Sequence, residues 1–129
     1  MWSIKPYDEY EKRVRKWPRK HRRELLAVHD NLDTYKKLLD SGTPVEQAKF
    51  GFIHTESSGS LAIDQKGAGP ATRETRLYFY PEKPTRTIHL FTLGDKDTQK
   101  EDNDYCKACV KALTTPNVQE RRLATQPTT

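Results

Sequence analysis

A chain of 129 residues with 33% hydrophobic side chains has room for one modest core, and this length argues against two independently folded domains. No run approaches eighteen apolar residues, which excludes a membrane-spanning helix, and 2 cysteines are too few for a disulfide scaffold. The first residues lack the apolar segment of a secretory signal, so we expect a cytoplasmic protein. The net charge of +5 favours an anionic partner, which could be nucleic acid, an acidic protein or a membrane surface.

Two amphipathic helices are predicted in the first third of the chain. Over residues 6–17 and again over 19–42, apolar residues recur at steps of three and four, which places them on one face of a helix. The first set is Tyr7, Tyr10, Val14 and Trp17, and the second is Leu25, Val28, Leu32, Tyr35 and Leu39. Pro18 separates the two segments and Gly42 can cap the second, so a short connection should leave the helices antiparallel.

Four strands are predicted next, from runs of β-branched and aromatic residues that lie between turn-forming residues. They cover residues 48–54, 61–65, 74–80 and 87–93. The segment 66–73 is rich in Gly, Pro and small residues, so it should be a mobile loop. Gly94 should end the last strand.

A third helix is predicted up to residue 113, and residues 114–129 are expected to form a flexible tail. Thr98 stands three residues before Glu101, which is the spacing of a capping box at a helix start. The expected buried stripe is Tyr105 or Cys106, Cys109 or Val110, and Leu113. Cys106 and Cys109 form a C-x-x-C on this helix, but no second pair follows, so we interpret them as packing residues rather than zinc ligands.

This order of elements predicts an α+β fold: an N-terminal helical hairpin, a small, four-stranded, mainly antiparallel sheet with the helices packed on one face, and a C-terminal helix. In the strand at 75–80, alternation assigns Leu77 and Phe79 to the core and Arg76 to the opposite, open face.

The helical hairpin, the strand "TRLYFY" with Arg76, the strand "TIHLFTLGDK" and the helix after it resemble the RelE/ParE superfamily of type II toxins. The similarity is closest to RelE- and HigB-like members, and it implies one RelE-like toxin domain over residues 1–113. Such a toxin is a ribosome-dependent mRNA endoribonuclease that inhibits translation. Its partners are a cognate antitoxin, the ribosome and mRNA, with no membrane and no metal or cofactor.

The resemblance also assigns roles to individual residues. Arg76 matches the strand-three Arg that contacts the scissile phosphate, while Lys66 and Lys96 match basic positions before and after it. The family often has a pair of lysines before that Arg and a Tyr at the last helix, whereas this chain has one Lys beside Asp64. The general base is therefore open among Lys66, His54 and Tyr105. Further candidate RNA contacts are Arg73, His89, Lys100, Arg19, Lys20, Arg22 and Arg23.

Two other classes of protein fit the same sequence pattern. A ParE-like toxin would act on DNA gyrase by protein contact, so the cationic residues of the sheet would be dispensable. A phage-type accessory protein would bind nucleic acid or a protein without catalysis.

Overall fold

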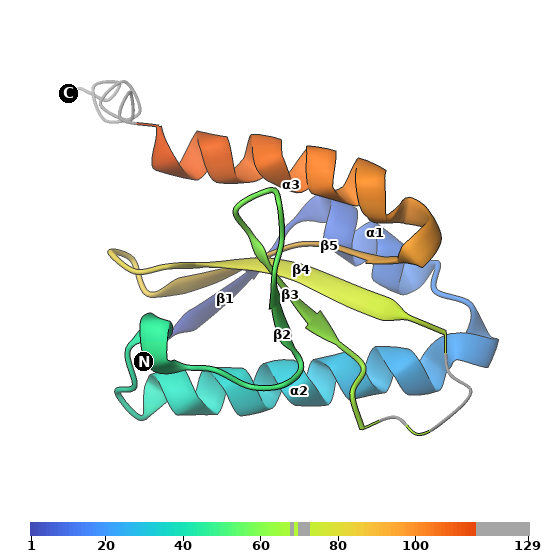
Figure 1. Cartoon of the computed structure of the whole chain (residues 1–129), viewed down its shortest axis with the longest axis horizontal. Helices are drawn as coiled ribbons and strands as arrows, with labels where there is room; N and C mark the ends of the chain where they lie inside the picture. Colours follow the sequence, from blue (N-terminus) through green and yellow to red (C-terminus); the bar gives the residue numbers. More distant parts are fainter. Residues whose placement is uncertain (68, 70–72, 116–129) are drawn as a thin grey trace.

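The structure is a computed structural model, and it describes residues 1–67, 69 and 73–115 (Figure 1). The helices are α1 (Asp8–Arg15), α2 (Arg22–Asp40) and α3 (Gln99–Thr114). The strands are β1 (Ser3–Pro6), β2 (Ile53–Thr55), β3 (Leu61–Asp64), β4 (Thr75–Glu82) and β5 (Thr87–Asp95). Short 3₁₀ turns occupy Arg19–His21, Val45–Gln47 and Lys96–Thr98. The predicted α+β class is confirmed, while most of the predicted tail lies outside the described residues.

The described strands form one five-stranded sheet in the order β1-β5-β4-β3-β2. The predicted number of four strands is wrong, because residues 3–6 form β1, which pairs in parallel with β5. This extra strand also moves β5 from the edge of the sheet to its interior. β1 was not predicted because it is defined by the distant segment with which its backbone pairs, Ser3 with Thr87 and Ile4 with Ile88.

Helices cover both faces of the sheet, so the prediction of one open face is wrong (Figure 1). α2 lies against β3 and β4 on one face, while α3 lies over β5 on the other. The alternation in β4 explains this arrangement: Leu77 and Phe79 face α2 as predicted, but Tyr78 on the other side is also completely buried. A sheet whose two faces are both apolar needs cover on both.

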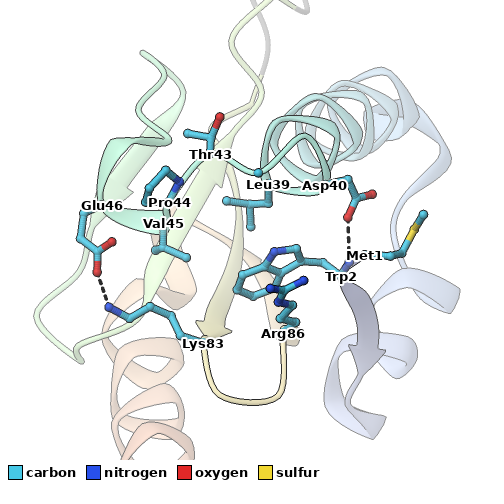
Figure 2. A pocket seen from close by; sticks show the side chains of 11 residues that line it. Met1, Trp2, Leu39, Asp40, Thr43, Pro44, Val45, Glu46, Lys83 and Arg86 are labelled. Carbon is cyan, nitrogen blue, oxygen red and sulfur yellow. Dashed lines mark hydrogen bonds and ion pairs between the residues drawn. The ribbon is translucent and has the colours of Figure 1, made fainter.

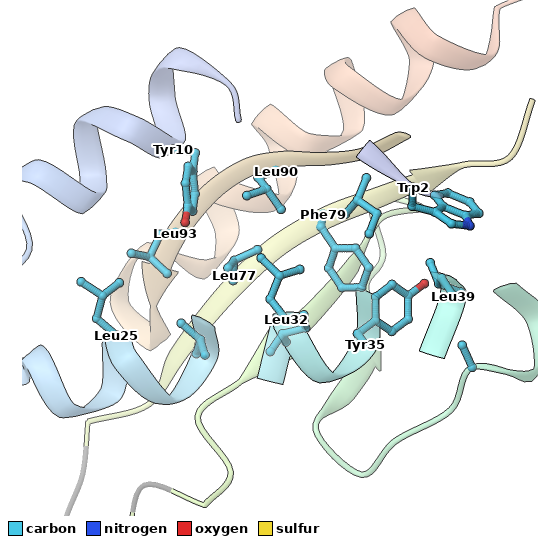
Figure 3. Packing of buried hydrophobic residues seen from close by; sticks show 14 residues of the cluster. Trp2, Tyr10, Leu25, Leu32, Tyr35, Leu39, Leu77, Phe79, Leu90 and Leu93 are labelled. Carbon is cyan, nitrogen blue, oxygen red and sulfur yellow. The ribbon is translucent and has the colours of Figure 1, made fainter. Parts of the chain in front are cut away.

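The larger core lies between α2 and the sheet (Figure 3). Leu32, Tyr35 and Leu39 of α2 meet Leu77 and Phe79 of β4 there, and the rings of Tyr35 and Phe79 pack edge to face with centroids 5.0 Å apart. Tyr10 of α1 and Leu93 of β5 close one end of this core, and Trp2 closes the other (Figure 3).

The cluster beneath α3 is smaller and more polar. Its buried members are Ala62, Tyr78, Phe91 and Cys106, and Cys109, Val110 and Leu113 pack against them as the predicted stripe requires. Among the described side chains, Tyr78 Oη, Thr92 Oγ1 and Asn103 Oδ1 are buried here without a hydrogen-bond partner. Both cysteines are free thiols, and burial raises their pKa, which fits the packing role.

The junction of β5 and α3 differs in detail from the prediction. Asp95, not Thr98, caps the turn by accepting hydrogen bonds from Asp97 N and Thr98 N, and Thr98 Oγ1 accepts one from Asp95 N in return. Gly94 lies inside β5, where a Cβ atom would come within 1.9 Å of Asp102 Oδ2. Only glycine therefore allows this approach of α3 to the strand.

No helix in the described part of the chain is long and apolar enough to cross a membrane.

Candidate functional site

A cleft of about 420 Å³ lies where β2, β3 and β4 meet the loop between β3 and β4. Asp64 of β3 pairs with Arg76 of β4 in the sheet register, and His54 of β2 stands beside them on the neighbouring strand. The described lining residues are His54, Asp64, Gln65, Lys66, Gly67, Gly69, Glu74 and Arg76. Three of the residues predicted from the sequence, His54, Lys66 and Arg76, are thus brought together.

His54 and Asp64 form a hydrogen-bonded pair in this cleft. His54 Nε2 lies 2.6 Å from Asp64 Oδ2, and Asp64 Oδ1 accepts a second hydrogen bond, 2.7 Å long, from the backbone N of Lys66. Because a carboxylate can only accept, we assign the proton to Nε2 in the neutral imidazole, which leaves Nδ1 as the proton acceptor. A carboxylate that orients a histidine in this way is the arrangement of a general base.

Lys66 is an exposed cation at the mouth of the cleft, with no ion pair among the described residues. Its side chain lies over Gly51, where a Cβ atom would come within 3.0 Å of Lys66 Nζ. Asn31 of α2 holds the backbone at this point, because its Nδ2 donates to the carbonyl oxygens of Asp64 at 3.0 Å and Lys66 at 3.2 Å. Asn31 thus fixes the backbone of Lys66, and the side chain passes over Gly51.

Arg76 is held by two glutamates. Its Nη1 donates to Glu56 Oε2 at 2.6 Å, and its Nε donates to Glu74 Oε2 at 2.9 Å. Burial disfavours the charged guanidinium, but the hydrogen bond to Glu74 and the charge of Glu56 outweigh it and raise the Arg76 pKa. Glu56 is itself buried and accepts from Asn103 Nδ2 at 3.1 Å. Arg76 is thus rigid and cationic, and its charge is offset locally.

Tyr105 is a predicted general base that lies elsewhere. It lines a different cleft with Lys5, Pro6, Tyr7 and Asp8, between α3 and β1. Burial, together with a hydrogen bond to Cys109, raises its pKa, so Tyr105 keeps its proton near neutral pH. Tyr105 does not line the cleft that holds Arg76.

His89, a predicted RNA contact, is buried inside the molecule. Its Nδ1 lies 3.0 Å from Tyr7 Oη and its Nε2 lies 2.9 Å from Glu82 Oε1, and 4% of its surface is exposed. Both ring nitrogens are occupied and no phosphate could reach them. His89 therefore ties the start of α1 to β4 and β5.

The other predicted cations lie outside the cleft. Arg73 is paired with Asp95, and Lys100 is paired with Asp104 at 3.1 Å on α3. Lys96 is exposed in the turn after β5, at the end of the sheet where β4 begins (Figure 1). These residues share an end of the molecule with the cleft, but they do not line it.

The connection between α1 and α2 forms a strongly basic corner at the same end (Figure 1). Every cation in it is exposed, and none has an ion pair among the described residues. A Cβ atom at Gly69 would lie 3.7 Å from Arg23 Nη1, which brings the corner next to the cleft. The members of this basic corner are Arg15, Lys16, Arg19, Lys20, Arg22 and Arg23.

Sequence reasoning missed the carboxylates of the site. The sequence pattern indicates Asp64 only as a neighbour of Lys66, and it gives no indication of Glu56 or Glu74. Asp64 could have been found from the predicted hairpin, since its strand returns beside that of His54. Glu56 lies in the turn between β2 and β3 and reaches Arg76 across 20 residues, for which no sequence signal exists.

A further cleft, of about 260 Å³, lies at the opposite end of β4, between the end of α2 and the β4–β5 turn (Figure 2). Trp2 and Leu39 form its apolar wall, and ion pairs or hydrogen bonds join Glu46 to Lys83 and Asp40 to the backbone of Trp2 (Figure 2). None of the predicted site residues lines it.

No group of three His, Cys, Asp or Glu side chains in the described ranges is placed to hold a metal ion. Comparisons with protein-family models, with curated proteins and with solved structures found no match. Function therefore has to be inferred from the site itself.

Proposed function

We propose that this protein is a RelE-type toxin, an endoribonuclease that cleaves mRNA by using the side chains of the cleft between β2, β3 and β4. The observation that carries the proposal is the hydrogen-bonded pair of His54 and Asp64, which opens into the same cleft as Lys66 and Arg76. An antitoxin that holds the chain inactive, the ribosome and mRNA would be its partners.

The reaction would be the attack of a ribose 2′-oxygen on the adjacent phosphate. His54 Nδ1 takes the proton of the 2′-hydroxyl, the new P–O2′ bond forms and the P–O5′ bond breaks. Lys66 supplies the proton that the 5′-oxygen needs, and Arg76 stabilises the negative charge on the phosphate. The products are a 2′,3′-cyclic phosphate and a 5′-hydroxyl.

Catalysis should depend on His54 and Lys66. We expect His54→Gln to lower the cleavage rate roughly 10²- to 10⁴-fold, because this variant removes the general base but keeps a polar side chain of similar size. Lys66→Ala should also lower the rate. The measurement is primer extension on mRNA in a cell-free translation reaction with added protein.

Lys100→Ala is the control, because it removes another exposed lysine, one that lies outside the cleft. If His54→Gln and Lys66→Ala cleave as fast as Lys100→Ala, the assigned site is wrong. If no protein cleaves mRNA but gyrase supercoiling is inhibited, a ParE-like toxin replaces the present proposal.

A non-catalytic nucleic-acid-binding protein is the second candidate, and one observation favours it. Glu56 and Glu74 offset the charge of Arg76, and a phosphate would have to compete with them. Binding of RNA without cleavage, by the wild type and by His54→Gln alike, would support this candidate.

A further inference from the structure

Another cleft, of about 370 Å³, lies between α1 and the end of β5. It is lined by Arg13, Trp17, Pro18, Arg73, Gly94, Asp95 and Thr98. We propose that this cleft binds one unstacked base of a single-stranded RNA, with the indole of Trp17 as the stacking surface. The inference rests on the proposed function and extends it, because it names a second contact for the same RNA.

The indole of Trp17 is fixed in place. Its Nε1 donates a hydrogen bond of 3.1 Å to the carbonyl oxygen of His21, and the ring packs against the larger core on one side. Trp17 nevertheless stays half-buried and lines the cleft. An aromatic surface that is held rigid and left partly open is suited to stacking, since little conformational freedom is lost on binding.

The interior of the cleft is balanced in charge, which suits a neutral base. Arg13 donates to Glu9 Oε2 at 3.0 Å and to the carbonyl oxygen of Leu93 at 2.8 Å, and Arg73 is paired with Asp95. These guanidinium groups already have carboxylate partners. They offer hydrogen-bonding edges rather than uncompensated charge.

The rim of the cleft, in contrast, is strongly positive. Trp17 and Pro18 stand in the middle of the basic corner, whose cations are exposed and have no ion pair among the described residues. Phosphates on either side of the stacked base would meet Lys16 and Arg19, the residues next to this pair in the sequence. Aromatic stacking surfaces combined with cations that follow the backbone are the general means of binding single-stranded nucleic acid.

The base cleft and the catalytic cleft lie on either side of β4. Arg73 lines the first and Glu74, the next residue, lines the second. β3 and β5 are the two neighbours of β4 in the sheet, and Asp64, Arg76 and Gly94 pair side by side, so both clefts lie at the same end of adjacent strands. One short stretch of RNA can therefore occupy both.

The chain has 2 tryptophans, which allows a direct test by fluorescence. Trp2→Phe leaves Trp17 as the only tryptophan, and Trp17→Phe leaves Trp2, which is 9% exposed at the other end of the core; excitation at the red edge of the tryptophan band avoids the tyrosines. The probe is a mixed-sequence 2′-O-methyl decaribonucleotide, which cannot be cleaved. We expect it to quench the emission of Trp2→Phe and to leave that of Trp17→Phe unchanged.

Affinity is measured in the same samples by the anisotropy of labelled RNA. Trp17→Ala should weaken binding roughly 5- to 150-fold, the usual loss when one stacking residue is removed. Arg19→Ala should lower the slope of log K against log salt by about 0.7 if Arg19 holds one phosphate of a single strand. Thermal melts identify any variant that does not fold, and the quenching in Trp2→Phe then decides the outcome.

RNA binding without quenching of Trp17, or with unchanged affinity in Trp17→Ala, would overturn the base site and leave the nuclease proposal intact. No binding of the probe at low salt would also overturn it. Quenching of Trp17 in a protein that cleaves no mRNA would support the base site and reject the nuclease.

Discussion

Arg76 shows how the surroundings of one residue decide what it can do. Glu56 is buried, so Arg76→Ala would leave its carboxylate without a charged partner, and such a loss typically costs about 1–3 kcal/mol or more. Glu74 differs, because 39% of its side chain is exposed at the mouth of the cleft. Glu56 therefore fixes the guanidinium, while Glu74 competes for it with an incoming phosphate.

Glu74→Gln should strengthen RNA binding. The substitution removes one negative charge from the cleft and leaves Arg76 anchored by Glu56, so a phosphate meets less competition. An exposed ion pair of this kind is worth about 0.2–1 kcal/mol, so we expect affinity to rise by up to roughly fivefold. The measurement is RNA anisotropy at constant salt.

Glu46→Gln is the matched control for this change. It also removes one exposed glutamate that is paired with a cation, here Lys83, but it lies at the opposite end of β4. Equal gains in both variants would mean that net charge alone controls binding, and Glu74 would then have no special position.

Sequence alone could predict which way Arg76 points, because period-two alternation in a strand fixes the face of every side chain. It could not predict what meets Arg76 on that face. Glu56 comes from the turn between β2 and β3, and its position depends on the packing of that turn near Asn103 of α3. The sequence leaves three candidate bases, His54, Lys66 and Tyr105. The hydrogen bond to Asp64 distinguishes His54, and this contact depends on the pairing of β2 with β3.

At the scale of elements, α2 and α3 are attached to the sheet in different ways. α2 contributes Leu25, Val28, Leu32, Tyr35 and Leu39 to the larger core. The buried residues of α3 are Cys106 and the acidic Asp102, and three buried polar atoms of this layer have no partner among the described residues. Burial of unpaired polar atoms costs free energy, so the interface between α3 and the sheet should be less stable than the interface between α2 and the sheet.

We therefore expect α3 to open before α2 when native-state hydrogen exchange is followed by mass spectrometry at increasing urea. Amides of α3 from Asn103 to Leu113 should exchange through a partial opening that costs less free energy than global unfolding, while the centre of α2 should exchange only globally. Equal opening free energies for the two helices would show that the polar layer does not weaken the interface between α3 and the sheet.

The long helices were predictable from their apolar spacing, whereas β1 was not. The sequence places α2 and α3 close to their observed bounds because each carries several turns of apolar spacing. β1 has four residues and is defined by its partner, β5. The choice of sheet face for α3 was also beyond the sequence, because its stripe would fit either apolar side of the sheet.

At the scale of the whole molecule, charge is distributed unevenly. The basic corner, Lys66 and Lys96 all lie at the end where β4 begins, next to both clefts (Figure 1). At the other end, lysines such as Lys83 and Lys36 are paired with carboxylates. The net charge of +5 could be read from composition, but its concentration at one end depends on the fold.

Folding stability should fall as the pH is lowered through about 6.5, the ordinary pKa of histidine, and His29 is the reason. Burial lowers the pKa of His29 in the folded protein, although Asp33 and Asp30 partly oppose this shift. Its Nε2 lies 2.5 Å from the hydroxyl of Tyr10, whose own pKa burial raises to about 12, so at neutral pH Tyr10 donates to an uncharged ring.

Below about pH 6.5 the unfolded chain binds a proton that folded His29 resists, so the free energy of unfolding decreases with acidification until the folded pKa is reached. His29→Gln keeps a hydrogen-bonding side chain but cannot titrate, and its stability should change less with pH between 7 and about 5. Urea unfolding of both proteins at several pH values measures the two slopes, and any constant loss from the altered Tyr10 contact drops out of the comparison. Parallel curves over that range would assign the acid sensitivity to other groups.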